Sequence, residues 1–553
     1  MSDAGMAENV QSLSLEEPKV PSEGRSEAEK AAKKAAKAAA KAQKEAEKAA
    51  KAASRGQKQA SVTEADPNDP LASQYGDVEL VQSQTISGNV WTKVEKLDPS
   101  IEGTTVLVRA RVQTVRGKGK SAFLVLRQEL ATVQAVLFVD DNTVSKGMVK
   151  YASAITRESV VDVTGVVVRP LAPVEGCSQS EVELKVTAIR CVARAGPLPF
   201  EIADAAARGA EAISKATEAG EQVVTVLQDT RLDNRIIDLR TPANHSIFRV
   251  QSAVTQLFRE FLLKEDFVEI HTPKLLGGAS EGGASVFKLD YMGQPACLAQ
   301  SPQFYKQMAI CSDLPRVFEV GPVFRAENSY THRHLCEFTG LDMEMTINES
   351  YHEVLDVVDR LFHTMFEGLN ERCARELTTI NSQYPFAPLK FLPKAPRLEF
   401  AEGIKMLQEA GHDVDPFGDL NTELERVLGK IVAEKYNTDF YILHRYPSAI
   451  RPFYTMPCKD DERYSCSYDI FIRGEEIISG AQRIHDPSLL ERRAKECGIP
   501  VETIQAYVDS FKYGAWPHGG IGVGMERVVM LFCGLDNVRK TSMFPRDPKR
   551  LAP

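Results

Sequence analysis

The sequence has no long hydrophobic run. Within its 553 residues, no stretch approaches the roughly 18 to 20 consecutive apolar residues that a membrane-spanning helix requires. The first residues, MSDAGMAENVQ, are acidic and polar, whereas a secretory signal peptide begins with basic and then apolar residues. We therefore expect a cytoplasmic protein that has no membrane as a partner.

The sequence also lacks closely spaced cysteine pairs. Its ten cysteines include no C-x-x-C motif. A zinc ribbon would use such pairs, and a disulfide framework would use regularly spaced cysteines in a short secreted chain. Neither is predicted, and we expect reduced, mostly buried thiols.

An overall excess of positive charge is absent as well. The formal net charge is -9, which argues against attraction of the whole protein to nucleic acid. A mean charge hides local patches, however, and residues 27–53 contain almost nothing but Ala, Lys and Glu. On a helix, the lysines of this segment would lie along one face; they are Lys30, Lys33, Lys34, Lys37, Lys41, Lys44, Lys48 and Lys51.

This basic stripe has no apolar stripe that could dock on a core. We therefore expect residues 1–78 to form a lysine- and alanine-rich extension, a frayed helix or disordered segment without a fixed packing partner. Two hypotheses stay open for it. It is either a solvated tail or a non-specific binder of nucleic-acid phosphates, in which lysines release counterions.

Short alternating strands dominate the next part of the chain. Apolar and polar residues alternate in five segments, which are residues 105–115, 121–128, 132–139, 159–168 and 180–189. Five short strands in about one hundred residues predict a small barrel of the OB-fold type over residues 79–196.

The barrel carries two features of a platform for single-stranded nucleic acid. The basic, glycine-rich turn RGKGKS follows the first strand, and Phe123 lies on the second. An aromatic ring can stack on a base while cations follow the phosphates. The alternative is that Phe123 is an ordinary core residue.

A proline-marked boundary, PLPF, ends the barrel region, and residues 197–240 are predicted to be a hinge. A long helix is expected from Ser246, with an apolar face that includes Ile247, Val250, Val254, Phe258 and Phe261. A strand that ends at Pro273 follows it. The remainder mixes strands and helices without βαβ repetition, which favours an antiparallel α+β domain over residues 241–553.

The segment FRAENSYTHRHLCEFTGLDMEM, residues 324–345, predicts a charged hairpin. Strand alternation places Arg325 with Glu327 on one face, and Asp342 with Glu344 and Phe338 on one face. Leu341, Met343 and Met345 fall on the opposite face. Four charges gathered on a sheet are costly unless they bind something. The alternatives are a structural ion-pair network or a metal site at H-x-H-x-C, residues 332–336.

Three segments together resemble a known family. The hairpin is similar to motif 2 of the class II aminoacyl-tRNA synthetases, Pro273 with its helix and strand resembles motif 1, and GIGVGMERVVM resembles motif 3. The resemblance runs from the barrel to FPRDPKRL at residues 544–551 and is strongest to the aspartate-specific eukaryotic branch of subclass IIb. It implies a tRNA-binding extension, an anticodon-binding OB-fold and a class II catalytic domain.

The resemblance implies an activity that joins aspartate to its tRNA through aspartyl-adenylate, with ATP and Mg²⁺. It assigns catalytic roles to Arg325, Glu327 and Arg527. The residues it assigns to ATP binding are Arg325, Glu327, Arg333, His334, Phe338, Glu476, Gly524 and Arg527. Asp469 and Glu476 would hold Mg²⁺, since hard oxygen ligands beside phosphates suit this ion.

The resemblance also implies an aspartate pocket. Its residues are Ser280, Glu281, Gln303, Lys306, Asp342, Ser479 and Arg483. Lys306 and Arg483 would hold the side-chain carboxylate, and Asp342 would organise these cations. Because related asparagine enzymes typically lack this lysine, its presence favours aspartate. The glycine-rich segment LLGGASEGGASVF resembles the loop that closes over the amino acid.

In the barrel, Arg116, Phe123 and Gln134 match positions that contact the anticodon in this family. Motif 1 implies a symmetric homodimer with Pro273 near its interface.

Three other functions remain open. A catalytically dead RNA-binding relative would have lost parts of the ATP site, but Arg325, Glu476 and Arg527 are all present. A ligase that amidates aspartate without tRNA would not need the barrel or the basic extension. A relaxed enzyme that charges both aspartate and asparagine tRNAs would have the same motifs.

Overall fold

The protein is described here by a computed structural model. It covers residues 64–83, 86–140, 142–206, 224–277 and 286–553, with residues 214, 218 and 220 in addition. The predicted lysine-rich helix, and the predicted aspartate-site residues Ser280 and Glu281, lie outside the described residues. The chain divides into two compact units, Met1–Pro197 and Leu198–Pro553.

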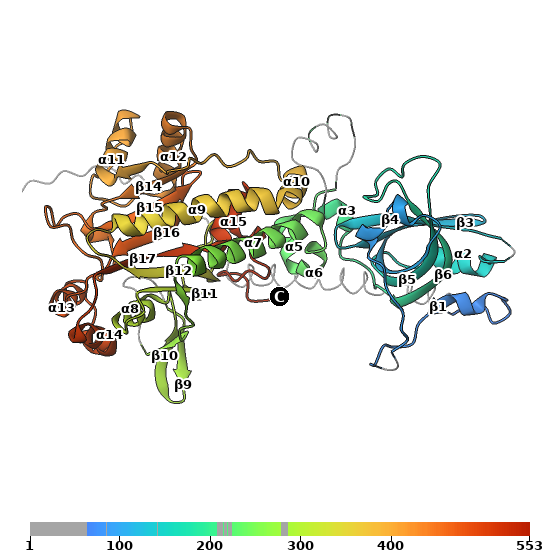
Figure 1. The fold of residues 1–553 in the computed structure, drawn as a ribbon, viewed down its shortest axis with the longest axis horizontal. Helices are drawn as coiled ribbons and strands as arrows, with labels where there is room; N and C mark the ends of the chain where they lie inside the picture. Colours follow the sequence, from blue (N-terminus) through green and yellow to red (C-terminus); the bar gives the residue numbers. More distant parts are fainter. Residues whose placement is uncertain are drawn as a thin grey trace, which may run out of the picture. The chain divides into compact units, whose positions relative to one another are not determined.

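The first unit contains the predicted barrel (Figure 1). The five expected strands are confirmed as β2 (Thr105–Lys118), β3 (Ser121–Gln128), β4 (Ala131–Phe138), β5 (Val160–Val168) and β6 (Glu183–Ala193). A short additional strand, β1 (Tyr75–Asp77), pairs in parallel with β6. The sheet order is β1-β6-β4-β3-β2-β5, and a further pairing of β6 with β5 closes the ring.

Strand alternation explains why these segments close into a barrel. Val106, Val108, Ala110 and Val112 on β2 point into a buried core, and the residues between them are more exposed. The sequence interpretation missed helix α2 (Lys146–Ser153), which contacts β2 and β3. Its signal was Ser145, whose side chain accepts a hydrogen bond from the Met148 backbone N–H as a helix N-cap.

The second unit is built on one sheet of eight strands, which confirms the antiparallel α+β prediction. The order is β13 (Arg397–Glu399), β14 (Phe440–His444), β15 (Ser467–Ile472), β16 (Glu475–Gln482), β17 (His518–Gly524), β12 (Glu337–Thr346), β11 (Arg316–Phe324) and β7 (Val268–Glu269). Only the two outermost pairs, β13 with β14 and β11 with β7, are parallel.

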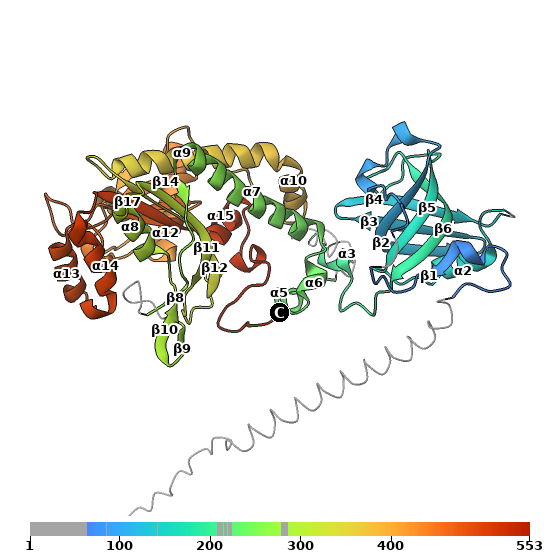
Figure 2. The same ribbon diagram turned by 60° about the horizontal axis from the view of Figure 1, so that its bottom comes forward.

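Long helices cover the sheet, and their apolar faces form its core. Helices α7 (Pro242–Lys264) and α9 (His352–Arg372) run side by side along the sheet (Figures 1 and 2). The predicted apolar face of α7 is confirmed, since Ile247, Val250, Val254 and Phe258 are buried in this core and Phe261 packs against it. The helix begins at Pro242 instead of Ser246, because proline suits the first helical position.

The smaller elements of this unit surround the sheet. A three-stranded sheet contains β8 (Leu275–Leu276), β10 (Gln294–Leu298) and β9 (Lys288–Tyr291). The other α-helices with described bounds are α3 (Ile202–Ala205), α5 (Gln228–Asp233), α6 (Arg235–Asp238), α8 (Gln303–Cys311), α10 (Ala374–Gln383), α11 (Phe400–Glu409), α12 (Thr422–Tyr436), α13 (Pro487–Glu496), α14 (Gln505–Ser510) and α15 (Met525–Phe532). Among the helices of the described part, none has both the length and the apolarity needed to cross a membrane.

Residues near the end of the predicted hinge are packed into the second unit. The side chain of Arg235 on α6 is buried and donates hydrogen bonds to the backbone carbonyls of Ser542 (2.9 Å) and Met543 (2.9 Å). It also pairs with Asp238 at 2.5 Å. This part of the chain is therefore fixed to the C-terminal segment.

Helix α12 approaches the β15–β16 hairpin with no space for a side chain between them. A Cβ added to Gly429 would lie 2.3 Å from the Cα of Gly474, a glycine with φ of +74° in the hairpin turn. Backbone on both sides makes this contact rigid. The position of α12 therefore depends on Gly429.

We predict that Gly429→Ala destabilises the protein by about 1–3 kcal/mol, because a methyl group must displace the turn at Gly474. Alanine would otherwise favour a helix by roughly 1 kcal/mol over glycine. Urea unfolding measures the change, with Lys430→Ala at the exposed neighbouring position as the matched control. A Gly429→Ala protein as stable as the control would contradict the packing argument.

Candidate active site

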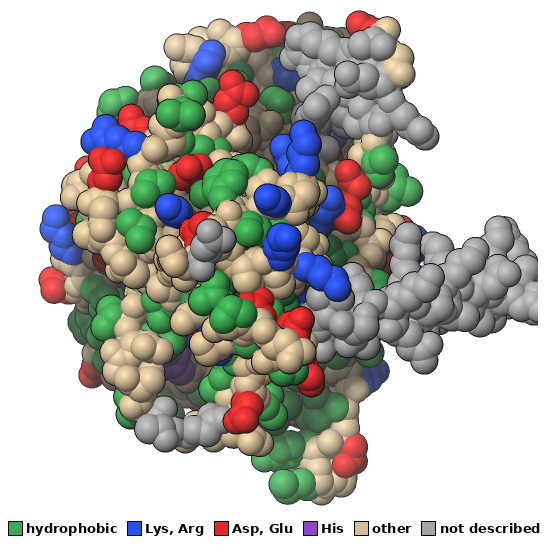
Figure 3. Space-filling view, turned by 90° about the vertical axis from the view of Figure 1, so that its right-hand side faces the viewer, with side chains coloured by type: hydrophobic (Ala, Val, Ile, Leu, Met, Phe, Trp, Pro, Cys, Tyr) green, Lys and Arg blue, Asp and Glu red, His purple; other side chains and the backbone are tan. Residues whose placement is uncertain are grey.

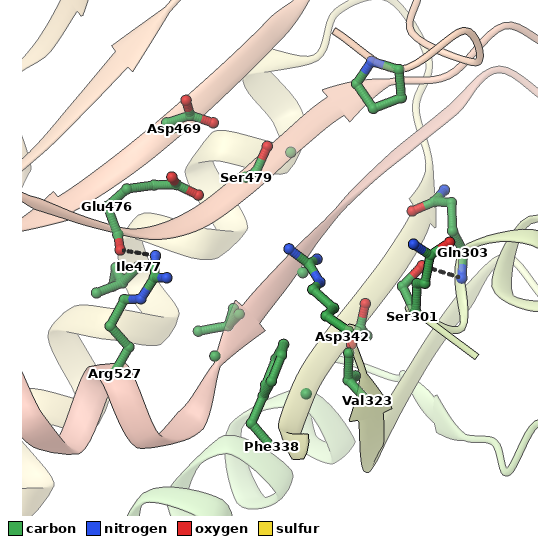
Figure 4. A pocket seen from close by; sticks show the side chains of 18 of the residues that line it. Ser301, Gln303, Val323, Phe338, Asp342, Asp469, Glu476, Ile477, Ser479 and Arg527 are labelled. Carbon is green, nitrogen blue, oxygen red and sulfur yellow. Dashed lines mark hydrogen bonds between the residues drawn. The ribbon is translucent and has the colours of Figure 1, made fainter. Parts of the chain in front are cut away.

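A cavity of about 400 Å³ opens over the central strands of the eight-stranded sheet. Its lining comes from the β11–β12 hairpin, from β15, β16 and β17, and from the start of α15. Figure 4 shows Val323, Phe338 and Asp342 entering from the hairpin, Asp469, Glu476 and Ser479 from β15 and β16, and Arg527 from α15. The site therefore combines residues that are far apart in the sequence.

The hairpin forms, with β11 and β12 antiparallel, but the prediction that Arg325 and Glu327 share a strand face is wrong, because β11 ends before both residues. Strand β11 ends at Phe324, and the Arg325 N–H then donates to the carbonyl of Cys336 at 2.8 Å. Leu341, Met343 and Met345 lie in the core, whereas Asp342 lines the cavity. The alternation of β12 thus separates the core from the site.

Glycines of β17 make room for the acidic residues of β12. A Cβ on Gly520 would lie 2.1 Å from the Met343 carbonyl oxygen and 2.3 Å from a Glu344 carboxylate oxygen. At Gly522 it would lie 3.3 Å from an Asp342 carboxylate oxygen. The glycine run thus lets two carboxylates pack against the backbone of the neighbouring strand.

At one end of the cavity, two cations and two carboxylates form a buried cluster. Lys306 Nζ lies 3.1 Å from Asp342 Oδ1 and 3.4 Å from Glu344 Oε2, and it donates to the Ile521 carbonyl at 2.8 Å. Arg483 Nε donates to Glu344 Oε1 at 2.9 Å, and its Nη2 lies 3.3 Å from Oε2. Asp342 and Glu344 therefore belong to an ion-pair network, with Lys306 and Arg483 as their partners.

The charges of this cluster compensate one another. Burial opposes ionisation of Glu344, but Arg483 and Lys306 overcome it and hold the pKa of Glu344 below its ordinary value. The sequence interpretation placed Glu344 on the charged face without assigning it to the aspartate pocket. Glu344 neutralises part of the positive charge of Lys306 and Arg483.

A chain of buried hydrogen bonds orients Gln303. The His518 ring donates through Nδ1 to the Trp516 carbonyl at 2.6 Å, and burial lowers its pKa, so Nε2 of the neutral ring accepts from Gln307 Nε2 at 2.9 Å. Gln307 Oε1 then accepts from Gln303 Nε2 at 2.8 Å. The carbonyl oxygen of Gln303 is therefore the atom available to a ligand in the cavity.

Three arginines converge at the other end of the cavity. Arg325 Cζ lies 5.7 Å from the ring centroid of Phe338. Arg527 donates to the backbone carbonyls of Glu476 (2.9 Å) and Arg333 (3.3 Å), and burial together with the charges of Arg333 and Arg325 lowers its pKa. An anion bound here would relieve this repulsion.

The loop of the hairpin is attached to α12, which the sequence interpretation did not foresee. Arg333 Nη1 pairs with Glu425 Oε2 at 2.5 Å, and burial raises the pKa of Glu425 to about 7 despite this partner. His332 Nε2 lies 3.1 Å from Glu475. Arg426 donates to Glu475 at 2.7 Å.

His334 and Glu327 also line this end of the cavity. Burial, with the charges of Arg527 and Arg333 in addition, lowers the pKa of His334 to about 4, so its ring is neutral near pH 7. His334 Nε2 lies 3.9 Å from Glu327 Oε2. The loop therefore presents guanidinium groups and one neutral ring to a bound anion.

The two predicted metal ligands lie on neighbouring strands. Asp469 accepts from Arg451 Nη1 (2.9 Å) and Nη2 (2.6 Å), and burial with the charge of Asp469 raises the pKa of Glu476. In the described part of the chain, no group of three or more His, Cys, Asp or Glu side chains could hold a metal ion. Two carboxylates beside an anion site fit Mg²⁺, which takes its remaining ligands from phosphates and water.

The start of α15 completes the wall of the cavity. Gly524 is the N-cap of α15 and pairs with Gly340 of β12. Both carboxylate oxygens of Glu526 accept from the Thr339 N–H at 3.1 Å, and burial raises the pKa of Glu526 to about 7. Glu526 thus connects α15 to the hairpin.

Most of the residues predicted for one site are brought together in this cavity. Lining it are Gln303, Arg325, Glu327, Arg333, His334, Phe338, Asp342, Asp469, Glu476, Ser479, Arg483, Gly524 and Arg527. Lys306 lies directly behind Asp342. The sequence did not point to Arg451, Glu425, Gln307 or His518, and the contacts of Glu425 with Arg333 and of Gln307 with His518 join distant parts of the chain. Pro273, the predicted dimer residue, is exposed between β7 and β8.

The barrel presents its predicted nucleic-acid residues on one outer surface. Arg116 and Phe123 are cross-strand partners on β2 and β3. Phe123 is partly exposed and lies outside the buried core, and its ring packs edge-to-face on Phe138 at 5.6 Å. Gln134 on β4 donates to Glu183 at 3.0 Å.

The predicted turn RGKGKS begins inside β2, which runs to Lys118, and this segment adds basic residues to the unit. Arg116, Lys118 and Lys120 are all exposed. Figure 3 shows Lys and Arg side chains gathered on the face that it presents. These features suit a negatively charged, base-containing partner.

Comparisons with known families cover both units. Residues 227–548 match the family described as tRNA synthetases class II (D, K and N). Residues 106–192 match the OB-fold nucleic acid binding domain family.

Similar curated proteins cover nearly the whole chain. The chain is 56% identical over 496 residues to aspartate–tRNA ligase 1, cytoplasmic, of Arabidopsis thaliana, covering 89% of this chain and 92% of the relative. It is 52% identical over 486 residues to the cytoplasmic aspartate–tRNA ligase of Homo sapiens, covering 88% and 96%.

Solved structures show the same fold. The aspartyl-tRNA synthetase of Entamoeba histolytica aligns with a TM-score of 0.80 at 47% identity, covering 87% of this chain and 96% of that one. The asparaginyl-tRNA synthetase of Pyrococcus horikoshii, complexed with asparaginyl-adenylate, aligns with a TM-score of 0.71 at 31% identity, covering 85% and 100%.

We predict that Glu344→Gln lowers the stability of the protein by about 3–5 kcal/mol at neutral pH, because two buried cations then share one carboxylate. The native pKa of Glu344 lies below the ordinary value of 4.5, so its contribution is present above that value and is lost as the pH falls through the native pKa. The stability difference from the wild type should therefore shrink in acid.

Urea unfolding at neutral and acid pH measures this difference. Glu349→Gln, at an exposed position just after β12, is the matched control. A difference for Glu344→Gln that stays constant into acid would show that the charge of Glu344 does not stabilise the cluster.

Proposed function

The chain belongs to the class II tRNA synthetases (D, K and N), and on this premise we propose that it joins L-aspartate to the 3′ end of aspartate tRNA with ATP. The reaction has two steps, which are formation of aspartyl-adenylate with release of pyrophosphate and transfer of aspartate to tRNA. The relatives at 52–56% identity are named cytoplasmic, and we place the protein in the cytoplasm.

The buried cluster around Lys306 is the observation that carries the choice of aspartate. Lys306 and Arg483 can contact the side-chain carboxylate of the substrate while Asp342 and Glu344 hold them in place. An asparagine side chain would bring no charge and would present an amide N–H₂ donor to two cations. That mismatch supports selection against asparagine.

The amino-acid end of the site also has an acceptor for the substrate ammonium group. The carbonyl oxygen of Gln303 faces the cavity because its N–H₂ group donates to Gln307. Ser479 lines the same region. Ser280 and Glu281, which lie outside the described residues, complete the proposed aspartate set.

In the first step, an oxygen of the α-carboxylate attacks the α-phosphorus of ATP, and the bond from that phosphorus to the bridging oxygen of pyrophosphate breaks. We assign Arg325 to the α-phosphate, and Arg333 with His334 to the outer phosphates. Phe338 and Arg527 would hold the adenine between them. The three converging guanidinium groups would neutralise the charge that builds in the transition state.

Asp469 and Glu476 would hold Mg²⁺ at this end of the site. The ion, when bound, would neutralise phosphate charge and orient the outer phosphates. Arg451 forms an ion pair with Asp469, and its positive charge reduces the repulsion between the Asp469 and Glu476 carboxylates.

The second step transfers aspartate to the terminal adenosine of tRNA. Glu327 would position this nucleotide, and we assign no general base among the described motif residues. Positioning and electrostatic stabilisation would therefore carry most of this step.

The extension and the barrel would bind the rest of the tRNA. The proposed division is an extension at residues 1–78, an anticodon-binding barrel at 79–196, a hinge at 197–240 and a catalytic domain at 241–553. Arg116, Phe123 and Gln134 on the outer surface of the barrel would contact the anticodon. We propose a homodimer with Pro273 near its interface.

Pyrophosphate exchange with aspartate and asparagine in parallel tests the proposed function, followed by charging of the two purified tRNAs. Exchange with aspartate alone and charging of aspartate tRNA alone would support it. No exchange would favour a non-catalytic RNA-binding protein, and charging of both tRNAs would favour a relaxed enzyme.

We predict that Lys306→Met lowers kcat/KM for aspartate in pyrophosphate exchange by roughly 100-fold or more. The substitution removes the positive charge that would pair with both Asp342 and the side-chain carboxylate of the substrate. Lys288→Met, at an exposed position on β9, is the matched control. Thermal unfolding confirms that the variant is folded. Unchanged aspartate kinetics would remove Lys306 from the assignment.

We also predict that deletion of residues 1–63 weakens tRNA binding at low salt and reduces the dependence of the dissociation constant on salt, because fewer lysines then release counterions. Deletion of residues 1–26, which keeps the lysine stripe, is the control. Aspartate-dependent exchange should stay unchanged in both. Equal tRNA affinity of the two deletions would indicate a solvated tail.

A further inference from the structure

Two cysteines with their sulfur atoms in contact lie next to the candidate site. Cys458 Sγ and Cys466 Sγ are 3.9 Å apart and share a hydrogen bond. Cys458 is buried, whereas Cys466 is partly exposed to solvent. Both belong to the segment between β14 and β15, and neither is used by the proposed reaction.

Backbone pairing holds the two cysteines on the same side of a short antiparallel ribbon. Pro457 pairs with Ser465 between them. The Cys458 N–H donates to the Tyr464 carbonyl, and the Cys466 N–H donates to the Met456 carbonyl, both at 2.9 Å. Because successive residues of a strand alternate between faces, Cys458 and Cys466 share the face opposite to that of Pro457 and Ser465.

The thiol hydrogen bond makes the pair chemically unequal. It lowers the pKa of Cys458 and raises the pKa of Cys466, so Cys458 is the more acidic thiol of the pair. By contrast, burial raises the pKa of Cys191 to about 11 and that of Cys533 to about 12. A thiolate beside a protonated thiol is the arrangement of an attacking and a resolving cysteine.

We propose that Cys458 and Cys466 form a reversible disulfide when the protein meets a hydroperoxide. The Cys458 thiolate attacks the terminal peroxide oxygen, the O–O bond breaks, the departing oxygen takes a proton from solvent and leaves as the alcohol or water, and a sulfenic acid remains on Cys458. The Cys466 sulfur then attacks the Cys458 sulfur, the S–O bond breaks and water leaves. The two sulfurs lose two electrons in total, and the peroxide gains them.

Formation of the disulfide would change the cavity through the ribbon that carries both cysteines. The sulfurs must approach from 3.9 Å to about 2.05 Å, so the two segments must shift. Met456 donates its N–H to the Gln482 carbonyl at 3.0 Å, and Thr455 pairs with Arg483 in an isolated bridge. Thr455 and Arg483 both line the cavity. Oxidation should therefore lower aspartate activation. This consequence rests on the proposed function, whereas formation of the disulfide is independent of it.

The first test treats the full chain with graded hydrogen peroxide, blocks the remaining thiols by alkylation and maps the digested peptides by mass spectrometry. We expect a cross-link between Cys458 and Cys466, complete at roughly tenfold less peroxide than oxidation of the exposed Cys497 requires. Dithiothreitol should remove it. Oxidation of Cys497 while both Cys458 and Cys466 remain alkylatable would overturn the proposal, as would sulfinic acid without a cross-link.

The matched variants are Cys466→Ser and Cys373→Ser, the second replacing a buried cysteine of the core. Cys466→Ser should stop at a sulfenic acid on Cys458 that a dimedone probe traps, and Cys373→Ser should cross-link like the wild type. No trapped sulfenic acid in Cys466→Ser would contradict the assigned order of attack.

Pyrophosphate exchange before and after peroxide measures the consequence for the site. We expect a fall of at least roughly threefold that dithiothreitol reverses in the wild type and in Cys373→Ser. A mapped disulfide with unchanged exchange would overturn the coupling to the cavity. Absence of exchange in the reduced protein would instead count against the proposed function, because the peptide map does not depend on activity.

Discussion

The ion pairs of Glu344 with Arg483 and Lys306 are the interaction on which the rest of the candidate site depends. A carboxylate with no exposed surface is tolerated in the sheet only because two cations share it. To reach them, Glu344 must lie against the backbone of β17, which requires Gly520. One buried charge thus determines a glycine on the next strand and a lysine on α8, and it fixes the amino-acid end of the cavity.

Strand β12 places core residues on one face and the charged residues of the site on the other. On β12, Leu341, Met343 and Met345 pack with α7 and α9 in the core, while Asp342 and Glu344 point to the cavity side. A shift of one residue in the register would exchange the two sets. The large core on one face therefore fixes the positions of charges on the other, and this precision is what an in-line displacement at phosphorus requires.

The sequence predicted the elements whose signals are local. Strand alternation gave the five barrel strands and the β11–β12 hairpin, and the apolar stripe gave α7. It did not give α2 or the partners of the loop that follows β11. Glu425 meets Arg333 across 92 positions, and Arg451, which lies outside the strands, meets Asp469 of β15 across 18 positions. Such contacts are decided by tertiary packing, which leaves no periodic signal in either segment.

Internal counter-charges give the cavity a common design at both ends. Arg333 is held by Glu425, Asp469 by Arg451, and Lys306 with Arg483 by Asp342 and Glu344. Each of these groups thus has an opposite charge from the protein. Ordering of these long side chains precedes binding, so a ligand does not have to supply that entropy. A bound ligand must instead replace a protein carboxylate or cation as the partner of a charged side chain. This replacement is favourable only when the ligand places a charge of the same sign at the same position. Arrangement of charge, more than its total amount, is therefore what lets the site distinguish aspartate and ATP from other molecules.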